Sequence, residues 1–153
     1  MGDFPATVWD RLIGAPDAPA GQQHPNALTL AQYKRAIARD LEVLLNTRSA
    51  VPPHELDAYP ACRESIANFG LVDFAHLCLT SSDDRKEICD RLVATVMRHE
   101  PRLVQVRARL LDGAGTVNRL SFVIAGKLRA LSSEGHVQFD LMLEPSSLKY
   151  TIR

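Results

Sequence analysis

The spacing of hydrophobic residues changes abruptly at Glu100-Pro101-Arg102, and this change limits the chain to helices followed by strands. Before the tripeptide, apolar residues recur every three or four positions, as they do on one face of a helix. After it, they alternate with polar residues, as in strands with one buried face. Pro101 has no amide proton and disfavours helical geometry at Glu100, so a helix must end here.

Two long helices are predicted before the change. The first lies within 28–48 and has Thr29 as its N-cap, and the second begins at Ser81 or Ser82. Basic residues at the end of the second helix, Arg98 and His99, suit the negative end of the helix dipole. The buried stripes are expected to consist of Leu30, Tyr33, Ile37, Leu41, Leu44 and Leu45 in the first helix, and Ile88, Cys89, Leu92, Val93 and Val96 in the second.

The region between the helices, 49–81, is predicted to consist of loops with short helical turns. One such turn lies in "YPACRESIANFGL", where Ile66 and Phe69 are expected to point inward and Gly70 to cap the turn.

Up to four antiparallel strands are predicted after the change, in 103–111, 119–131, 137–143 and 148–153. One apolar sheet face covered by the two long helices gives an α+β fold, with N-terminal helices packed on a C-terminal meander sheet of three to four strands. The inward-facing residues are expected to be Val104, Val106, Ala108, Leu110, Leu120, Phe122, Ile124, Leu128, Val137, Phe139, Leu141, Leu143, Leu148, Tyr150 and Ile152.

The first 27 residues are predicted to stand apart from this fold. Residues 1–14 contain an amphipathic element, and residues 15–27 read as a Pro-rich linker. The remainder, 28–153, is expected to form a single domain, a length that buries a core without disulfides or a metal.

The charge balance argues against a nucleic-acid binder held by a general basic field, because Lys and Arg equal Asp and Glu at 18 each. The two halves differ, however. Residues 1–100 carry 10 basic and 14 acidic side chains, and residues 101–153 carry 8 and 4. Such asymmetry suits a subunit with two different neighbours, and chance explains it equally well. Three unpaired cysteines and an acidic start without an apolar run predict a reduced, cytoplasmic protein without membrane insertion.

No motif of catalysis, cofactor binding or metal binding is found, so no catalytic residue, cofactor or metal is expected. His76 and Cys78, with Cys62 or Cys89, are conceivable metal ligands, although a small core residue explains Cys89 better. Glu100 is a conceivable glycosidase acid, with a second carboxylate from Asp73 or Glu64, but a structural ion pair is favoured. The basic strand residues Arg107, Arg109, Lys127 and Arg129 are a conceivable RNA contact, yet they lack interleaved aromatic residues.

A series of short motifs carries a family resemblance. "LLNTR" (44–48), "YP" (59–60), "SIANFGLVD" (65–73) and "HEPR" (99–102) occur in this order, and "VWDRL" and "VQFDLMLEPSSLKYTIR" stand at the two ends. Taken together they resemble the TssE family, baseplate wedge subunits of bacterial type VI secretion systems. That family is similar to the sheath-initiating, lysozyme-like baseplate wedge protein of contractile-tailed phages.

The resemblance implies a structural, non-enzymatic role in a baseplate docked at the cytoplasmic side of the membrane. Implied partners are the wedge proteins TssF and TssG, the nearby TssK and the sheath proteins TssB and TssC. The resemblance also implies that Glu100, Pro101 and Arg102 contact the wedge. The alternative function is a peptidoglycan hydrolase that uses Glu100.

Two further expectations concern surfaces. The edge of the last strand, with Lys149, Tyr150, Thr151, Ile152 and Arg153, is expected to receive a sheath segment as an added strand. At the wedge contact, Arg102→Ala is expected to weaken binding and to leave thermal stability nearly unchanged.

Overall fold

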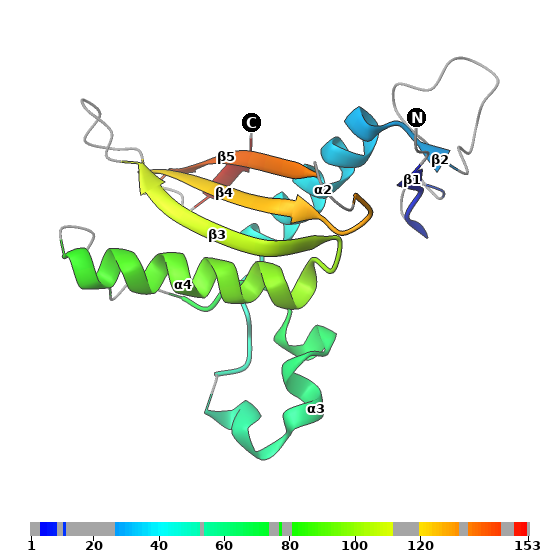
Figure 1. Cartoon of the computed structure of the whole chain (residues 1–153). Coiled ribbons are helices and arrows are strands. Elements are labelled where there is room, and N and C mark those ends of the chain that lie inside the picture. The colour runs from blue at the N-terminus through cyan, green and yellow to red at the C-terminus, as the bar shows by residue number, and fades with distance from the viewer. Residues whose placement is uncertain are drawn as a thin grey trace. The chain divides into compact units, whose positions relative to one another are not determined.

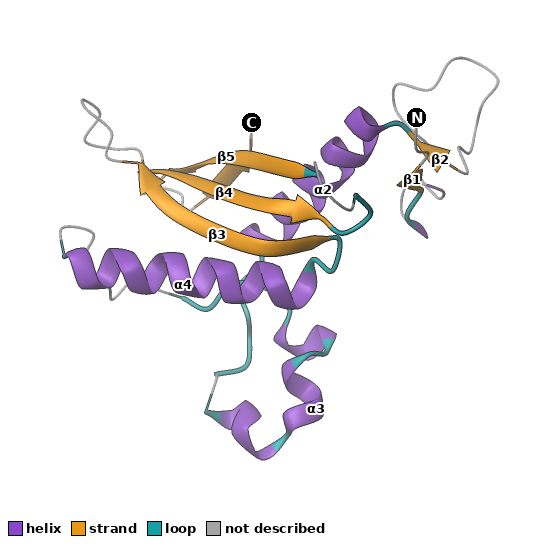
Figure 2. Cartoon of the chain, viewed as in Figure 1, coloured by secondary structure: helices purple, strands orange, loops and turns teal. Residues whose placement is uncertain are grey.

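The computed structural model describes residues 4–8, 11, 27–52, 54–73, 77, 81–111, 120–131, 135–144 and 149–152. The chain divides into two compact units, Met1–Arg39 and Asp40–Arg153. Helix α2 (Leu30–Asn46) runs across the boundary between them. Figure 2 shows the helices and strands of both units.

The second unit contains a four-stranded antiparallel sheet, which confirms the predicted α+β fold. Its order is β3-β4-β5-β6, so each strand pairs with the next one along the chain, and β3 and β6 are the edges. Figure 1 shows the curved sheet with helix α4 (Ser82–His99) lying along β3. The strands are β3 (Leu103–Leu111), β4 (Leu120–Leu128), β5 (His136–Glu144) and β6 (Lys149–Ile152).

Helix α4 begins and ends where the sequence predicts. Ser81 is the N-cap, and its Oγ accepts a hydrogen bond from the Asp84 N–H at 3.4 Å. Buried residues on one face are Ile88, Leu92 and Val96, whereas the two other residues of the expected stripe, Cys89 and Val93, are half-buried.

The predicted alternation holds in β5 and only partly in the other strands. Val123 of β4 is buried although it lies between the inward residues Phe122 and Ile124. In β6, Tyr150 is buried and Ile152 is half-buried, while Leu148 lies outside the described residues. The inward residues of β5 are all buried, namely Val137, Phe139, Leu141 and Leu143. In β3 the register shifts between Val104 and Arg107, where Gln105 has a positive φ of 53°. This β-bulge inserts one residue, so Leu103 is buried in place of Val104. Strict alternation was therefore wrong at the start of β3.

The N-terminal unit pairs two short strands, β1 (Phe4–Pro5) and β2 (Ala27–Leu28), which the sequence did not predict. The Phe4 ring stacks on Tyr33 of α2 with 4.7 Å between ring centroids. Thr29 caps α2 as predicted, because its Oγ1 accepts from the Gln32 N–H at 3.3 Å and its N–H donates to the Gln32 side chain at 2.9 Å. Of the amphipathic element expected in 1–14, residues 1–3, 9, 10 and 12–14 lie outside the described residues, as do residues 15–26 of the expected linker.

Not every residue of the α2 stripe is buried. Tyr33, Ile37, Leu41, Leu44 and Leu45 are buried, but Leu30 is 39% exposed. Leu30 is the first residue of the helix and has no preceding turn to pack beside, which corrects its predicted inward position.

Residues 54–68 form a helical excursion between α2 and α4. It consists of η1 (Glu55–Ala58), α3 (Pro60–Arg63) and η2 (Ile66–Asn68), and Figure 1 shows it on the side of α4 that faces away from the sheet. Ile66 is 88% exposed, which corrects its predicted inward position. The inward position of this turn is taken by Asn68, which is buried and donates from Nδ2 to the Arg63 carbonyl at 2.8 Å.

The excursion returns to the fold through Gly70. This residue has a φ of +111°, and a Cβ there would lie 2.6 Å from the carbonyl oxygen of Thr47. The Leu71 N–H donates to that same carbonyl at 2.8 Å, so only glycine fits the crossing.

Candidate functional site

The tripeptide Glu100-Pro101-Arg102 forms the corner between α4 and β3. Glu100 ends the helix, and its carbonyl accepts from the Leu103 N–H at 3.1 Å, which closes the turn. The Arg102 carbonyl accepts from the Arg129 N–H at 2.8 Å, which ties the corner to the end of β4. Pro101 is exposed at the tip.

Arg102 is held by two carboxylates. Oε1 of Glu100 accepts from the Arg102 backbone N–H at 3.1 Å and from Nε at 2.6 Å, and Oε2 pairs with Nη2. The same Nη2 donates to Oδ2 of Asp40 at 2.6 Å. Because Asp40 belongs to α2, this corner cluster of Asp40, Glu100 and Arg102 joins α2, α4 and the start of β3.

The corner cluster is largely removed from solvent. The side chain of Glu100 is 4% exposed and that of Arg102 is 17%, while Asp40 reaches the surface at 32%. Burial lowers the pKa of Arg102, but the hydrogen bonds and charges of Glu100 and Asp40 outweigh it and raise the pKa above its usual value. The guanidinium therefore stays charged, and charge-assisted bonds fix its position.

This geometry changes the interpretation of the two charges. The sequence suggested that Glu100 and Arg102 stand ready at a rigid corner to bond a partner, but each already bonds the other inside the fold. The accessible parts of the corner are Pro101 and the partly exposed Asp40. A wedge contact at this corner stays a prediction.

The position of Glu100 bears on the hydrolase alternative. A general acid must reach the leaving-group oxygen of a substrate across an open cleft. Both oxygens of Glu100 accept from Arg102, and the residue is 3% exposed. The two candidate partner carboxylates, Asp73 and Glu64, are exposed. A buried carboxylate that is already paired is the structural ion pair favoured from the sequence.

The outer edge of β6 is covered by side chains of α2. Nδ2 of Asn46 donates to the Tyr150 carbonyl at 2.9 Å, and Oδ1 of Asn46 accepts from the Tyr150 N–H at 2.8 Å. One amide thus satisfies both edge groups of Tyr150, as a neighbouring strand would. The Ile152 N–H lies 3.5 Å from Oε2 of Glu42, a weaker contact. Arg153, the last residue of the expected sheath contact, lies outside the described residues.

Of the metal-ligand candidates from the sequence, only Cys62 and Cys89 lie within the described residues. Among the described residues, no group of three or more His, Cys, Asp or Glu side chains is arranged to hold a metal ion. Cys62 and Cys89 are free thiols, and burial raises the pKa of Cys89, as expected for a small core residue. His76 and Cys78 lie outside the described residues. No helix in the described part of the chain combines the length and hydrophobicity that a bilayer crossing needs.

Sequence reasoning missed the α2 residues that complete both features. Asp40 lies 62 positions from Arg102, and Asn46 lies 104 positions from Tyr150. Both are polar residues on the helix that carries the clearest apolar stripe, where a solvated face is the ordinary interpretation. The sequence offered one signal for these contacts, Asn46 in "LLNTR". From the sequence, Asn46 was interpreted only as the end of the helix.

The chain belongs to the family described as baseplate wedge protein gp25, whose model matches residues 31–132. The matched range contains α2 from its second residue on, the helical excursion, α4, β3 and β4, and therefore the entire corner cluster. Among curated proteins, none matches the chain.

Two solved structures are similar to the chain in fold. One is a chain of the baseplate complex from the type VI secretion system, with 15% sequence identity and a TM-score of 0.50 over 73% of this chain and 94% of that one. The other is a protein from Geobacter sulfurreducens that carries the proposed name of tail lysozyme. It has 16% sequence identity and a TM-score of 0.47 over 82% of this chain and 96% of that one. The first supports the α+β fold described above.

Proposed function

We propose that the protein is a structural subunit of a type VI secretion baseplate, which joins the wedge complex and seeds assembly of the contractile sheath. The observation that carries this proposal is the match of the baseplate wedge family to residues 31–132, about two thirds of the chain. The fold likeness to a chain of the type VI baseplate complex supports it. The expected neighbours are TssF, TssG and TssK in the baseplate and TssB and TssC in the sheath, on the cytoplasmic side of the membrane.

The wedge contact is proposed at the corner, with the corner cluster as its support. Glu100 holds the turn because its carboxylate accepts from three atoms of Arg102, namely the backbone N, Nε and Nη2. Pro101 is thereby presented on a rigid turn, and Asp40 adds a partly exposed carboxylate beside it. A pre-organised tip loses little entropy on binding, which favours affinity.

A pull-down with TssF and TssG tests the corner. Pro101→Ala removes the exposed ring and leaves the three charged side chains in place, so we expect weaker wedge binding with a small loss of stability. Pro60→Ala is the matched control, because Pro60 is also exposed and lies at the start of α3, away from the corner. Equal wedge binding by the two variants would remove Pro101 from the contact.

Sheath seeding is proposed at the outer edge of β6, with residues 149–153 as the docking strand. Tyr150 and Ile152 direct their amide groups outward to α2, so Lys149 and Thr151 direct theirs toward β5. An added sheath strand must therefore displace Asn46 and Glu42. The long Ile152 contact of 3.5 Å makes this end of β6 the easier one to open.

Ile152→Pro isolates the edge amide in a sheath-assembly assay. It removes the outward N–H at the end of the strand, and Ile152→Ala removes the same side chain but keeps the N–H. We expect Ile152→Pro to block polymerisation of TssB and TssC, and Ile152→Ala to support it, with both proteins folded. Normal assembly with Ile152→Pro would exclude strand addition at this position.

Absence of hydrolysis is tested with purified protein on peptidoglycan. We expect no release of soluble fragments, because Glu100 is buried and paired. Release that Glu100→Gln abolishes, while the variant keeps its fold, would overturn the structural assignment.

A further inference from the structure

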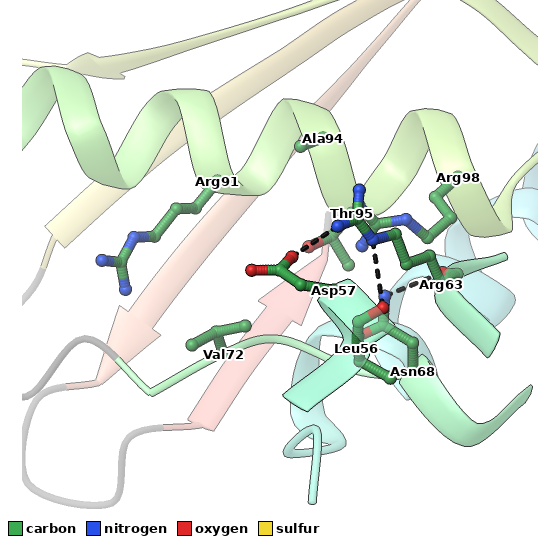
Figure 3. A pocket seen from close by; sticks show the side chains of 9 residues that line it. All are labelled: Leu56, Asp57, Arg63, Asn68, Val72, Arg91, Ala94, Thr95 and Arg98. Carbon is green, nitrogen blue, oxygen red and sulfur yellow. Dashed lines mark hydrogen bonds and ion pairs between the residues drawn. The ribbon is translucent and has the colours of Figure 1, made fainter. Parts of the chain in front are cut away.

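A pocket of about 380 Å³ lies between α4 and the helical excursion, apart from the corner cluster and from the edge of β6. This volume is in the range of ordinary ligand pockets. Figure 3 shows the nine side chains around it. They are Leu56, Asp57, Arg63, Asn68, Val72, Arg91, Ala94, Thr95 and Arg98.

The α4 wall of the pocket is a second face of that helix. Arg91, Ala94, Thr95 and Arg98 follow the i, i+3, i+4, i+7 spacing, so they form one continuous stripe. The sheet-facing stripe of Ile88, Leu92 and Val96 is a separate set. Two turns separate Arg91 from Arg98, or about 10 Å along the helix axis. Figure 3 shows Arg91 and Arg98 at opposite ends of the part of α4 that lines the pocket.

The opposite wall is held in place by hydrogen bonds. Asn68 is buried and donates to the Arg63 carbonyl, and its own carbonyl accepts from Nε2 of His99 at 2.9 Å. Nε of Arg63 donates to the Leu56 carbonyl at 3.3 Å. On the other side, Nη1 of Arg91 donates to the Asp73 carbonyl at 3.3 Å. The pocket is thus a built feature of the fold.

The lining is cationic, with three arginines and one aspartate. Asp57 is paired with Arg63, and Arg91 is paired with Glu87, which lies on the same helix one turn away. Arg98 is exposed and makes no hydrogen bond or ion pair within the described part of the chain. Arg98 is therefore a guanidinium that can still bind an anion, in a pocket whose other two arginines are each paired with a carboxylate.

We propose that this pocket binds an acidic segment of a neighbouring protein, with one carboxylate on Arg98 and a second near Arg91. The planar guanidinium can match a carboxylate through two parallel hydrogen bonds. In the wall itself, Nη2 of Arg63 already pairs with Oδ1 of Asp57 through a single contact. Leu56, Val72 and Ala94 give the methylene groups of acidic side chains an apolar surface.

A protein segment suits this pocket better than a free phosphate. Inorganic phosphate would fill little of 380 Å³ and would leave the apolar wall uncovered. Asp57 would repel a dianion near Arg63, whereas single carboxylates on Arg98 and Arg91 avoid it. Membership of a baseplate wedge family makes protein neighbours the relevant ligands. The proposal does not depend on the wedge contact at the corner or on the edge of β6.

Fluorescence anisotropy with a labelled hexaglutamate peptide tests the pocket on the full-length protein, with hexalysine as the charge control. Arg98→Gln removes one charge and breaks no described contact, so it should weaken hexaglutamate binding about tenfold, the loss typical of one charge-assisted hydrogen bond. Arg129→Gln is the matched control, since Arg129 is an exposed arginine outside the pocket. Ala94→Glu places a carboxylate in the pocket and should abolish binding with the melting temperature preserved.

Three results would overturn the proposal. One is the absence of hexaglutamate binding to the wild-type protein at low ionic strength. Another is an equal loss with Arg98→Gln and Arg129→Gln, which would mean binding by surface charge in general. The third is inorganic phosphate that binds more tightly than hexaglutamate and shows the same dependence on Arg98, which would make the pocket an oxyanion site.

Discussion

Arg102 connects three elements of the fold. It lies just before β3, and its side chain bonds the carboxylates of Glu100 at the end of α4 and of Asp40 in α2. We expect Arg102→Ala to lower the free energy of unfolding by about 3 kcal/mol, since it leaves the buried Glu100 carboxylate without its partner. For a domain of this size, the melting temperature should fall by roughly 6–12 °C. This reverses the expectation from the sequence that stability would hardly change.

The control for this prediction is Arg107→Ala, an exposed arginine on β3 that should change stability by less than about 0.5 kcal/mol. Thermal melts of both variants decide the matter. A melting temperature for Arg102→Ala equal to that of Arg107→Ala would mean that the corner cluster contributes nothing to the fold, and the charges would again be free to serve a partner.

We expect His99 to make the stability of the fold depend on pH. Burial lowers the pKa of His99 below 6.5, the Asn68 carbonyl opposes the shift, and the charge of Arg98 adds to it. As the pH falls, His99 is therefore protonated in the unfolded chain at a higher pH than in the folded one. The contribution of His99 is present above pH 6.5 and is lost as the pH falls through 6.5 and then through the lower folded-state pKa.

His99→Gln tests this dependence, because glutamine can donate to the same carbonyl and does not titrate. We expect the wild-type protein to lose stability relative to His99→Gln as the pH is lowered from neutral to about 5, measured by urea denaturation. Parallel stability curves for the two proteins over this range would show that His99 is not coupled to folding.

At the scale of elements, the end of α2 acts as the neighbour that β6 would otherwise lack. Asn46 satisfies two edge groups of Tyr150, so Asn46→Ala should cost about 2 kcal/mol, at roughly 1 kcal/mol per hydrogen bond. It should also expose a pairing edge and promote self-association. Denaturation measures the loss of stability, and size-exclusion chromatography measures the self-association. A monomeric variant of wild-type stability would show that the cap is dispensable.

Elements with a strong hydrophobic period were predictable from the sequence, and those set by single backbone positions were not. The buried faces of α4 and β5 follow from spacing alone, because three or four residues of each agree. The bulge at Gln105 adds one residue to β3 and shifts the buried set, and no turn residue marks it. The inward position predicted for Ile66 was wrong because one apolar residue in a short turn has no hydrophobic periodicity around it.

At the scale of the molecule, the sequence predicts the fold class and the family resemblance but not the contacts that complete the surfaces. Pro101 predicts the junction between helix and strand because its effect is local: it has no amide proton and a fixed φ. Asp40, Asn46 and the pocket residues of α4 acquire their roles only when distant segments meet. The excursion places Asp57 and Arg63 against the second face of α4, a face that the helical pattern alone marks as solvated.

The N-terminal residues offer a test of how the chain is organised. Phe4 is 5% exposed and stacks on Tyr33, whereas α4, the four-stranded sheet and the corner cluster all lie within Asp40–Arg153. We expect a protein lacking residues 1–26 to fold cooperatively with a loss of about 3–5 kcal/mol, the cost of one buried aromatic side chain. Phe4→Ala in the full chain should reproduce most of that loss. Urea denaturation of both proteins measures these losses.

If the shortened protein showed no cooperative transition while Phe4→Ala remained folded, residues 1–26 would be part of the folding core. The prediction of a domain spanning 28–153 would then be wrong.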